Sequence, residues 1–196
     1  MKAKNGNKLS QKELNVSVPA QNREEEFESI YNRSADMVYN VALRITGNPY
    51  FAEETVQEVF LKVFKNLARF EYRSNITTWI YRITVHTAIN IAKSRSRTKR
   101  IFEVIDEQIE SILSNPNDNV EKRAEQKSRD EFVRKMLDSL EPRYRSYIVL
   151  REIEGLSYEE ISKIMKKNIN TVRTRIKRAR EQLIKLFGRE VERNEM

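Results

Sequence analysis

The chain of 196 residues contains no cysteine and only one histidine. These two scarcities exclude a disulfide framework, a cysteine-rich zinc site and thiol catalysis. Glycine and proline are also rare, at four each, so no glycine-rich phosphate loop is available and few tight turns interrupt the chain. We therefore expect an all-α protein, and we expect it not to be an enzyme, to bind no metal, cofactor or small-molecule substrate, and to act by binding.

Long apolar runs are missing as well. No stretch approaches membrane-spanning length, and no apolar segment follows the lysines of the N-terminus as it would in a signal peptide. Hydrophobic residues make up 39% and charged residues 34% of the chain, which favours two small cores with charged surfaces over one large core. The sequence predicts a cytoplasmic protein.

The net charge of +8 is unevenly distributed. Residues 169–189 carry seven basic side chains against Glu181 alone, and residues 93–100 carry five basic side chains and no acid. Residues 101–128 carry seven acids against three bases, so an acidic connector separates two basic blocks. Basic blocks of this kind are typical of nucleic-acid contacts.

Periodicity and turn signals divide the chain into five parts. Residues 1–22 are polar and aperiodic and are expected to form a flexible tail. Residues 23–97 are expected to form a first helical domain and residues 130–188 a second one. Residues 98–129 are interpreted as an acidic linker, and residues 189–196 as a C-terminal tail.

Three amphipathic helices are expected in the first domain. The first runs from Arg23 to the break at Gly47, the second covers about residues 52–67, and the third starts at Ile76. Trp79 continues the apolar stripe of the third helix, so it is interpreted as a core residue and not as a stacking platform. The buried stripe of the second helix is expected to consist of Ala52, Val56, Val59, Phe60, Val63, Phe64 and Leu67.

The second domain contains a helix-turn-helix pattern. Ser157 and Glu160 have the spacing of a capping box at the start of a short helix. After a tight turn, Asn170 or Thr171 is expected to cap a longer helix that reaches about Leu186. The buried stripe of that helix is expected to consist of Val172, Ile176, Ala179 and Leu183.

Basic residues dominate the opposite face of this longer helix, near its N-terminus, from which a recognition helix reads bases. The residues expected to face base edges are Arg173, Thr174, Lys177 and Arg178. Three flanking residues are expected nearer to phosphates: Arg175, Arg180 and Lys185. The alternative is a basic surface helix that contacts only solvent.

Four segments carry a family resemblance: residues 155–161 and 171–180 in the second domain, and residues 52–60 and 78–83 in the first. Together they resemble the extracytoplasmic-function sigma factors of bacteria, over roughly residues 23–188. The resemblance implies a transcription initiation subunit that binds core RNA polymerase, reads two promoter elements, helps to melt the duplex and is then released. Its minus-thirty-five contacts would be Asn170, Thr171, Arg173, Thr174, Arg175, Lys177 and Arg178.

Two further sites follow from the resemblance. A polar loop and the next helix would hold a base flipped out of the minus-ten strand, through Tyr72, Arg73, Asn75, His86 and Asn90. One face of the second helix would contact the polymerase clamp helices, through Glu53, Glu54, Gln57 and Glu58. Read without the resemblance, that acidic face is an ordinary solvated surface. The family usually has Asn and Asp in place of His86 and Asn90, which leaves the minus-ten base preference open.

Three points stay open at this level. The acidic connector is either a plain tether or, as the resemblance implies, a segment that threads the RNA exit path. The polymerase flap and an anti-sigma factor are further partners that the resemblance implies. A helix-turn-helix regulator that acts without core polymerase is the alternative function, since the second domain by itself fits both.

Overall fold

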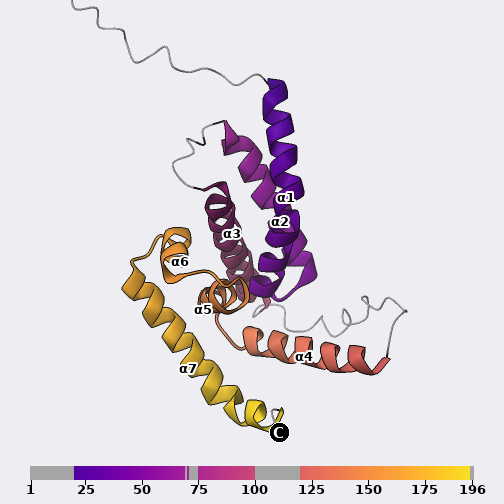
Figure 1. Cartoon of the computed structure of the whole chain (residues 1–196), viewed down its shortest axis with the longest axis vertical. Coiled ribbons are helices and arrows are strands. Elements are labelled where there is room, and N and C mark those ends of the chain that lie inside the picture. The colour runs from indigo at the N-terminus through magenta and orange to yellow at the C-terminus, as the bar shows by residue number, and fades with distance from the viewer. Residues whose placement is uncertain (1–19, 69, 71–74, 100–119, 195–196) are drawn as a thin grey trace, which may run out of the picture.

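The computed structural model describes residues 20–68, 70, 75–99 and 120–194, with side chains described for residues 23–68, 70, 75–94 and 129–188. Within these ranges every regular element is helical, which confirms the predicted all-α class (Figure 1). None of the described helices is long and apolar enough to cross a membrane. The elements are α1 (Ala20–Thr46), α2 (Pro49–Leu67), α3 (Ile76–Lys99), α4 (Val120–Asp138), α5 (Pro142–Ile148), the π-helix η1 (Val149–Ile153), α6 (Tyr158–Met165) and α7 (Ile169–Asn194).

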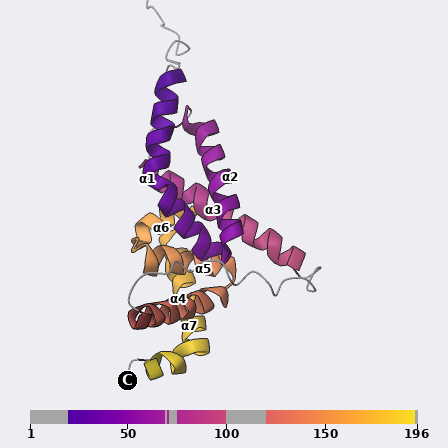
Figure 2. The same cartoon turned by 90° about the vertical axis from the view of Figure 1, so that its right-hand side faces the viewer.

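A tight turn joins α1 to α2 at the predicted break. Gly47 has φ +72°, a left-handed conformation that glycine adopts without steric cost. Asn48 then caps α2, since its side-chain oxygen accepts hydrogen bonds from the backbone N–H groups of Tyr50 and Phe51. Pro49 occupies the first helical position, where no backbone donor is needed. The chain reverses, and α1 and α2 lie side by side in both ribbon views (Figures 1 and 2).

Helices α1, α2 and α3 enclose a core of their own, which we call the first core. Trp79 packs against it and stacks on Phe70, with 4.7 Å between the ring centroids, so its interpretation as a core residue is confirmed. Phe64 was expected in this core but is 44% exposed, because Phe27 contacts its ring on one side and solvent reaches the rest. The buried members of the first core are Ile30, Val38, Val59, Phe60, Val63, Leu67 and Ile80.

A second core joins the C-terminal helices to the first three. Val41 and Ile45 on α1, and Val85 on α3, belong to the same buried cluster as Tyr147 and Leu150. Helices α5 and α6 therefore pack directly against α1 and α3, while α4 and α7 lie farther from the first unit (Figure 2). We call this cluster the shared core, because helices of both units contribute to it.

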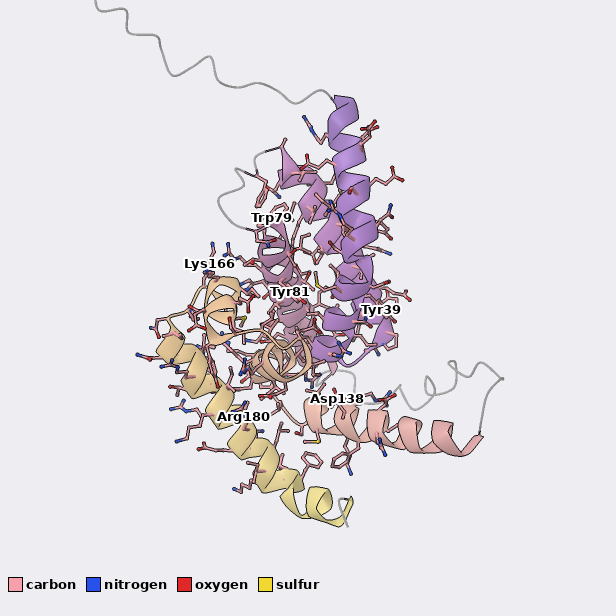
Figure 3. All side chains as sticks on the ribbon, viewed as in Figure 1. Tyr39, Trp79, Tyr81, Asp138, Lys166 and Arg180 are labelled. Atoms are coloured by element: carbon pink, nitrogen blue, oxygen red, sulfur yellow. The ribbon has the colours of Figure 1, made fainter. Side chains whose placement is uncertain are left out.

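Polar contacts cross the same junction. Glu154, just after η1, accepts hydrogen bonds from Arg44 on α1 at 3.0 Å and from the hydroxyl of Tyr81 on α3 at 2.8 Å. Burial and the neighbouring Glu154 carboxylate raise the pKa of Tyr81 above its ordinary value. Arg82 donates to the backbone carbonyl of Lys163 at the end of α6. In Figure 3, Tyr81 lies in the middle of the molecule, where the two units meet.

Arg145 on α5 connects three parts of the chain. Its buried guanidinium donates to the carbonyl of Ile45 at 3.1 Å, and to those of Asp138 and Leu140 at 3.1 and 3.2 Å. It also forms an ion pair with the Asp138 carboxylate at 2.8 Å. Burial lowers the pKa of Arg145, although the Asp138 charge opposes that effect. The α1–α2 turn and the end of α4 are thereby joined to α5.

The connector is only partly within the described residues. Its acidic portion between residues 100 and 119, and the N-terminal segment 1–19, lie outside them. Helix α4 begins at Val120, ten residues before the predicted start of the second domain. The helical part of the C-terminal unit is therefore longer at its N-terminal end than the sequence pattern indicates.

Candidate nucleic-acid interface

The short helix α6 begins with the predicted capping box. The backbone N–H of Glu160 donates to the Ser157 hydroxyl oxygen at 3.2 Å, and the Glu160 carboxylate accepts from the Ser157 backbone N–H at 2.8 Å. These bonds lower the pKa of Glu160. Helix α6 ends at Lys166, whose φ of +49° is left-handed and turns the chain sharply before α7.

Helix α7 is capped by Asn168 and not by the predicted Asn170 or Thr171. The side-chain oxygen of Asn168 accepts a hydrogen bond from the backbone N–H of Thr171 at 2.7 Å. The prediction was wrong because the helix begins at Ile169, which places both candidates inside its first turn. Thr174 donates from its hydroxyl to the Asn170 carbonyl at 2.8 Å.

The two faces of α7 separate as the sequence pattern predicts. Val172, Ile176 and Ala179 are buried in the shared core. The opposite face is exposed over its first turns and carries Arg173, Thr174, Lys177 and Arg178. The positive charge of α7 is therefore presented to solvent on one side of the second unit.

Several basic side chains of α7 are held by neighbours. Arg180, expected to contact phosphate, donates twice to the Glu152 carboxylate at 3.0 and 2.6 Å, and this pairing raises its pKa. Arg173 lies over the Tyr158 ring at 5.8 Å from the centroid, in cation–π geometry. Arg175 donates to the hydroxyl of the buried Tyr147 at 2.9 Å. The arginines of this helix thus differ in how freely they move.

An open polar depression lies at the N-terminal end of α7. Five of the seven residues predicted for the minus-thirty-five contact line it, and Arg173 and Lys177 lie outside it. Asn168, which was not predicted, also lines it, and its position just before the helix is the signal that identifies it as a cap. The lining residues are Asn168, Asn170, Thr171, Thr174, Arg175 and Arg178.

The predicted minus-ten residues lie apart from one another on α3. Asn75 caps this helix, accepting a hydrogen bond from the backbone N–H of Thr77 at 2.9 Å. His86 and Asn90 are exposed and one turn apart, about three turns further along the helix than Asn75. Tyr72 and Arg73 lie outside the described residues.

His86 faces the end of α6. Partial burial lowers its pKa, and the charges of Arg82, Lys166 and Lys167 act in the same direction. Two of these three cations belong to the C-terminal unit, so the histidine is placed near the junction of the two units. Its neutral form is favoured there.

Helix α2 presents the predicted polymerase face. Glu53 and Gln57 are exposed, Glu54 and Glu58 are partly so, and Glu58 pairs with Lys62 at 2.7 Å. The same side of the helix continues into apolar side chains that the sequence analysis did not select. Leu61 is 53% and Phe64 is 44% exposed. The signal for Leu61 was an apolar residue four positions after Gln57, outside the buried stripe.

Comparisons with known proteins bear on these surfaces. The family described as sigma-70 region 2 matches residues 30–98, which include α2 and α3. The family described as sigma-70 region 4 matches residues 133–183, which include the helix-turn-helix unit. The two matches occur in one chain and together cover both candidate surfaces. The fold is thus that of a sigma-70-type transcription factor.

Individual relatives narrow the class. The ECF RNA polymerase sigma factor SigE of Mycolicibacterium smegmatis is 32% identical over 157 residues, which cover 80% of this chain and 60% of that protein. The RNA polymerase sigma-H factor of Pseudomonas aeruginosa is 33% identical over 152 residues, or 76% of this chain and 79% of that one. The ECF RNA polymerase sigma-E factor of Escherichia coli is 39% identical over 138 residues, or 66% and 70%. This chain belongs to the extracytoplasmic-function sigma factors of bacterial RNA polymerase.

Two solved structures share the fold. The sigma factor RpoE of Bartonella quintana, in complex with the anti-sigma factor NepR, has a TM-score of 0.61 and 22% identity, covering 84% of this chain and 98% of that one. CnrH, in complex with the cytosolic domain of CnrY, has a TM-score of 0.60 and 18% identity, covering 84% and 89%. The arrangement of helices found here is therefore shared with known sigma factors.

Proposed function

We propose that this protein directs core RNA polymerase to promoters whose minus-thirty-five element is read by the exposed face of α7. The observation that carries this proposal is the basic first half of α7 beside the polar depression, in a chain with sigma-70 regions 2 and 4. Arg173 and Arg178 suit guanine edges, whereas Thr174 suits a thymine methyl or a polar base edge. Promoter melting would use the exposed side of α3 at His86 and Asn90.

The polymerase contact is assigned to α2. Glu54, Gln57 and Glu58 supply polar groups, and the exposed Leu61 and Phe64 supply apolar area on the same helix. A polar patch adjoining exposed apolar side chains is typical of a protein interface. We assign this surface to the polymerase clamp helices and the second unit to the flap. Binding and not catalysis is the proposed mode of action, in the cytoplasm.

An anti-sigma partner is part of the proposal. The two solved relatives are complexes with an anti-sigma factor in one case and with the cytosolic domain of CnrY in the other. This chain has the same packed arrangement of helices, with the two units joined by the shared core. We propose that an anti-sigma factor binds this packed form and keeps the protein from polymerase.

A reconstituted transcription assay tests the function. Core polymerase, this protein and promoter fragments selected from random-sequence DNA should give a promoter-specific run-off transcript that core polymerase alone does not produce. A regulator that acts without core polymerase would instead bind its DNA equally well in the absence of the enzyme. No specific transcript from any selected fragment would refute the proposal.

Point variants test the proposed reading face. Arg173→Ala and Arg178→Ala should each weaken holoenzyme binding by about 1–3 kcal/mol and relax the sequence preference at the upstream element. Lys185→Ala is the matched control, because it removes a charge farther along α7 and should weaken binding equally on all sequences. Equal, small effects from all three variants would mean that α7 contacts phosphates only.

A further inference from the structure

Arg175 and Tyr147 form an unusual pair at the edge of the polar depression. The Arg175 guanidinium donates to the Tyr147 hydroxyl at 2.9 Å, and its central carbon lies 5.4 Å from the centroid of the same ring. Tyr147 itself is fully buried in the shared core, whereas Arg175 is partly exposed and lines the depression. One rigid aromatic side chain thus holds a cation at the surface that is proposed to meet DNA.

The contact fixes the direction of the guanidinium. A guanidinium has five N–H donors in a planar fork, and the Tyr147 hydroxyl accepts from only one of its nitrogens. A free arginine on a helix surface loses considerable rotamer freedom when it binds a phosphate. Arg175 has already lost much of that freedom on folding, because Tyr147 is immobilised by the helices packed around it.

The surroundings of Arg175 fit a phosphate group. Arg178 lies one turn further along α7 on the same depression, so two cations face one polar hollow. Asn168, Asn170 and Thr171 add polar groups at the N-terminal end of the helix, where backbone dipoles favour an anion. The base-facing residues Arg173 and Lys177 lie outside this hollow. The hollow therefore adjoins the base-facing residues without including all of them.

We propose that Tyr147 is a positioning residue that orients Arg175 onto a backbone phosphate beside the minus-thirty-five element. This inference rests on the proposed function, because it assumes that α7 docks on promoter DNA. Tyr147 does not touch the DNA. It acts through Arg175, which sets the register of α7 on the duplex while neighbouring side chains read bases.

The alternative is that Arg175 only satisfies a buried hydroxyl. In that case the pair stabilises the fold and has no part in DNA binding. Burial raises the pKa of Tyr147 and the Arg175 contact opposes that rise, which both explanations predict equally. A double-mutant cycle on holoenzyme binding separates them, since coupling between the two residues in DNA affinity appears only if they act as a unit.

The experiment measures the affinity of the reconstituted holoenzyme for a selected promoter fragment over a range of salt concentrations. Tyr147→Phe keeps the ring and its packing but removes the acceptor, and should weaken binding about 3- to 10-fold. Arg175→Gln should weaken binding further and reduce the slope of log K against log salt by about 0.9, the value for one phosphate contact. In the Arg175→Gln background, Tyr147→Phe should then change affinity less than about twofold.

Two variants serve as controls. Tyr144→Phe removes a hydroxyl from the same helix, away from Arg175, and should leave affinity unchanged. Arg175→Lys keeps the charge without the planar fork, and should lose most of the affinity that Arg175→Gln loses while folding normally. It also makes Tyr147→Phe nearly silent, which tests the coupling without removing the charge.

The outcomes are distinguishable. A wild-type holoenzyme that selects no promoter overturns the proposed function and this inference with it. A wild-type holoenzyme that binds, combined with equal losses from Tyr147→Phe in both backgrounds, overturns the positioning role alone. If Arg175→Gln alters sequence preference and leaves the salt slope unchanged, Arg175 contacts a base and the phosphate assignment is wrong.

Discussion

The two units of this protein are stabilised differently. The first unit encloses a core made only by α1, α2 and α3. The C-terminal unit shares its core with α1 and α3, which contribute Val41, Ile45 and Val85. The first unit therefore has the contacts to fold by itself, while the C-terminal unit leaves apolar area uncovered without its neighbour. Changes at the junction should thus affect the C-terminal unit more than the first.

The largest effect is expected at Arg145. Arg145→Ala leaves three backbone carbonyls and Asp138 without their donor, and should lower the free energy of unfolding by about 3–5 kcal/mol. Urea denaturation checks this with two probes. Trp79, the single tryptophan, reports on the first unit by fluorescence, and circular dichroism reports on all helices. The circular dichroism transition should shift farther than the fluorescence transition.

Arg143→Ala is the matched control, because Arg143 is exposed on the same helix. It should change stability by no more than about 0.5 kcal/mol. Coincident transitions from both probes in Arg145→Ala would contradict the asymmetry between the units, since they would mean that the whole chain unfolds as one.

A pair of glycines provides the second test. Gly47 and Gly155 both have left-handed φ angles, of +72° and +68°, so alanine costs about 1 kcal/mol at either position. A β-carbon on Gly47 would also lie 2.5 Å from the Asp138 carboxylate oxygen, whereas one on Gly155 meets nothing within 4 Å. Gly47→Ala should therefore cost about 2–3 kcal/mol in total, measured by thermal unfolding. Equal costs for both variants would show that Asp138 moves aside freely.

The third test concerns Glu154, which contacts both Arg44 and Tyr81 across the junction. Glu154→Gln removes the charge and should destabilise the protein by about 1 kcal/mol, because Arg44 is partly exposed and water screens the pair. Combining it with Tyr81→Phe should give a non-additive loss in a double-mutant cycle. Glu152→Gln, which breaks only the exposed pair with Arg180, should cost about 0.5 kcal/mol or less.

The smallest effect is a pH dependence at His86. Its pKa in the folded protein is lowered by burial and by Arg82, Lys166 and Lys167, so the unfolded chain binds a proton more readily. Stability from this source is present above the unfolded pKa of about 6.5 and is lost as pH falls through the lower folded value. Urea denaturation from pH 8 to pH 5 should show this loss, and His86→Gln should reduce it. An identical pH profile in the variant would show that His86 contributes nothing.

Local sequence rules predicted most of the fold. The turn at Gly47, the capping box of α6 and the buried stripe of α7 follow from residue type and spacing alone, and all three are confirmed. The shared core was not predicted. Val41, Ile45 and Val85 fit the stripes of their own helices, and nothing in helical periodicity tells whether a neighbouring helix comes from the same unit.

The candidate site was predicted in outline. Helical spacing placed Arg173, Thr174, Lys177 and Arg178 on one exposed face, as the structure has them. The partners of Arg175 and Arg180 were not predicted, because Tyr147 and Glu152 approach from elements 28 positions away in the chain. Such contacts depend on how α5 and η1 pack against α7, which sequence spacing does not encode.

The π-helix η1 gives the chain a constraint of length. Its wide turn is closed by the hydrogen bond from the Glu154 N–H to the Val149 carbonyl, five residues back, so it holds one residue more than an α-helical turn would. Deleting one residue between positions 149 and 153 would rotate everything that follows by about 100°. Glu152 and Glu154 could then no longer reach α7 and α1 together. We expect this segment to accept many exchanges of side chain but no change in its number of residues.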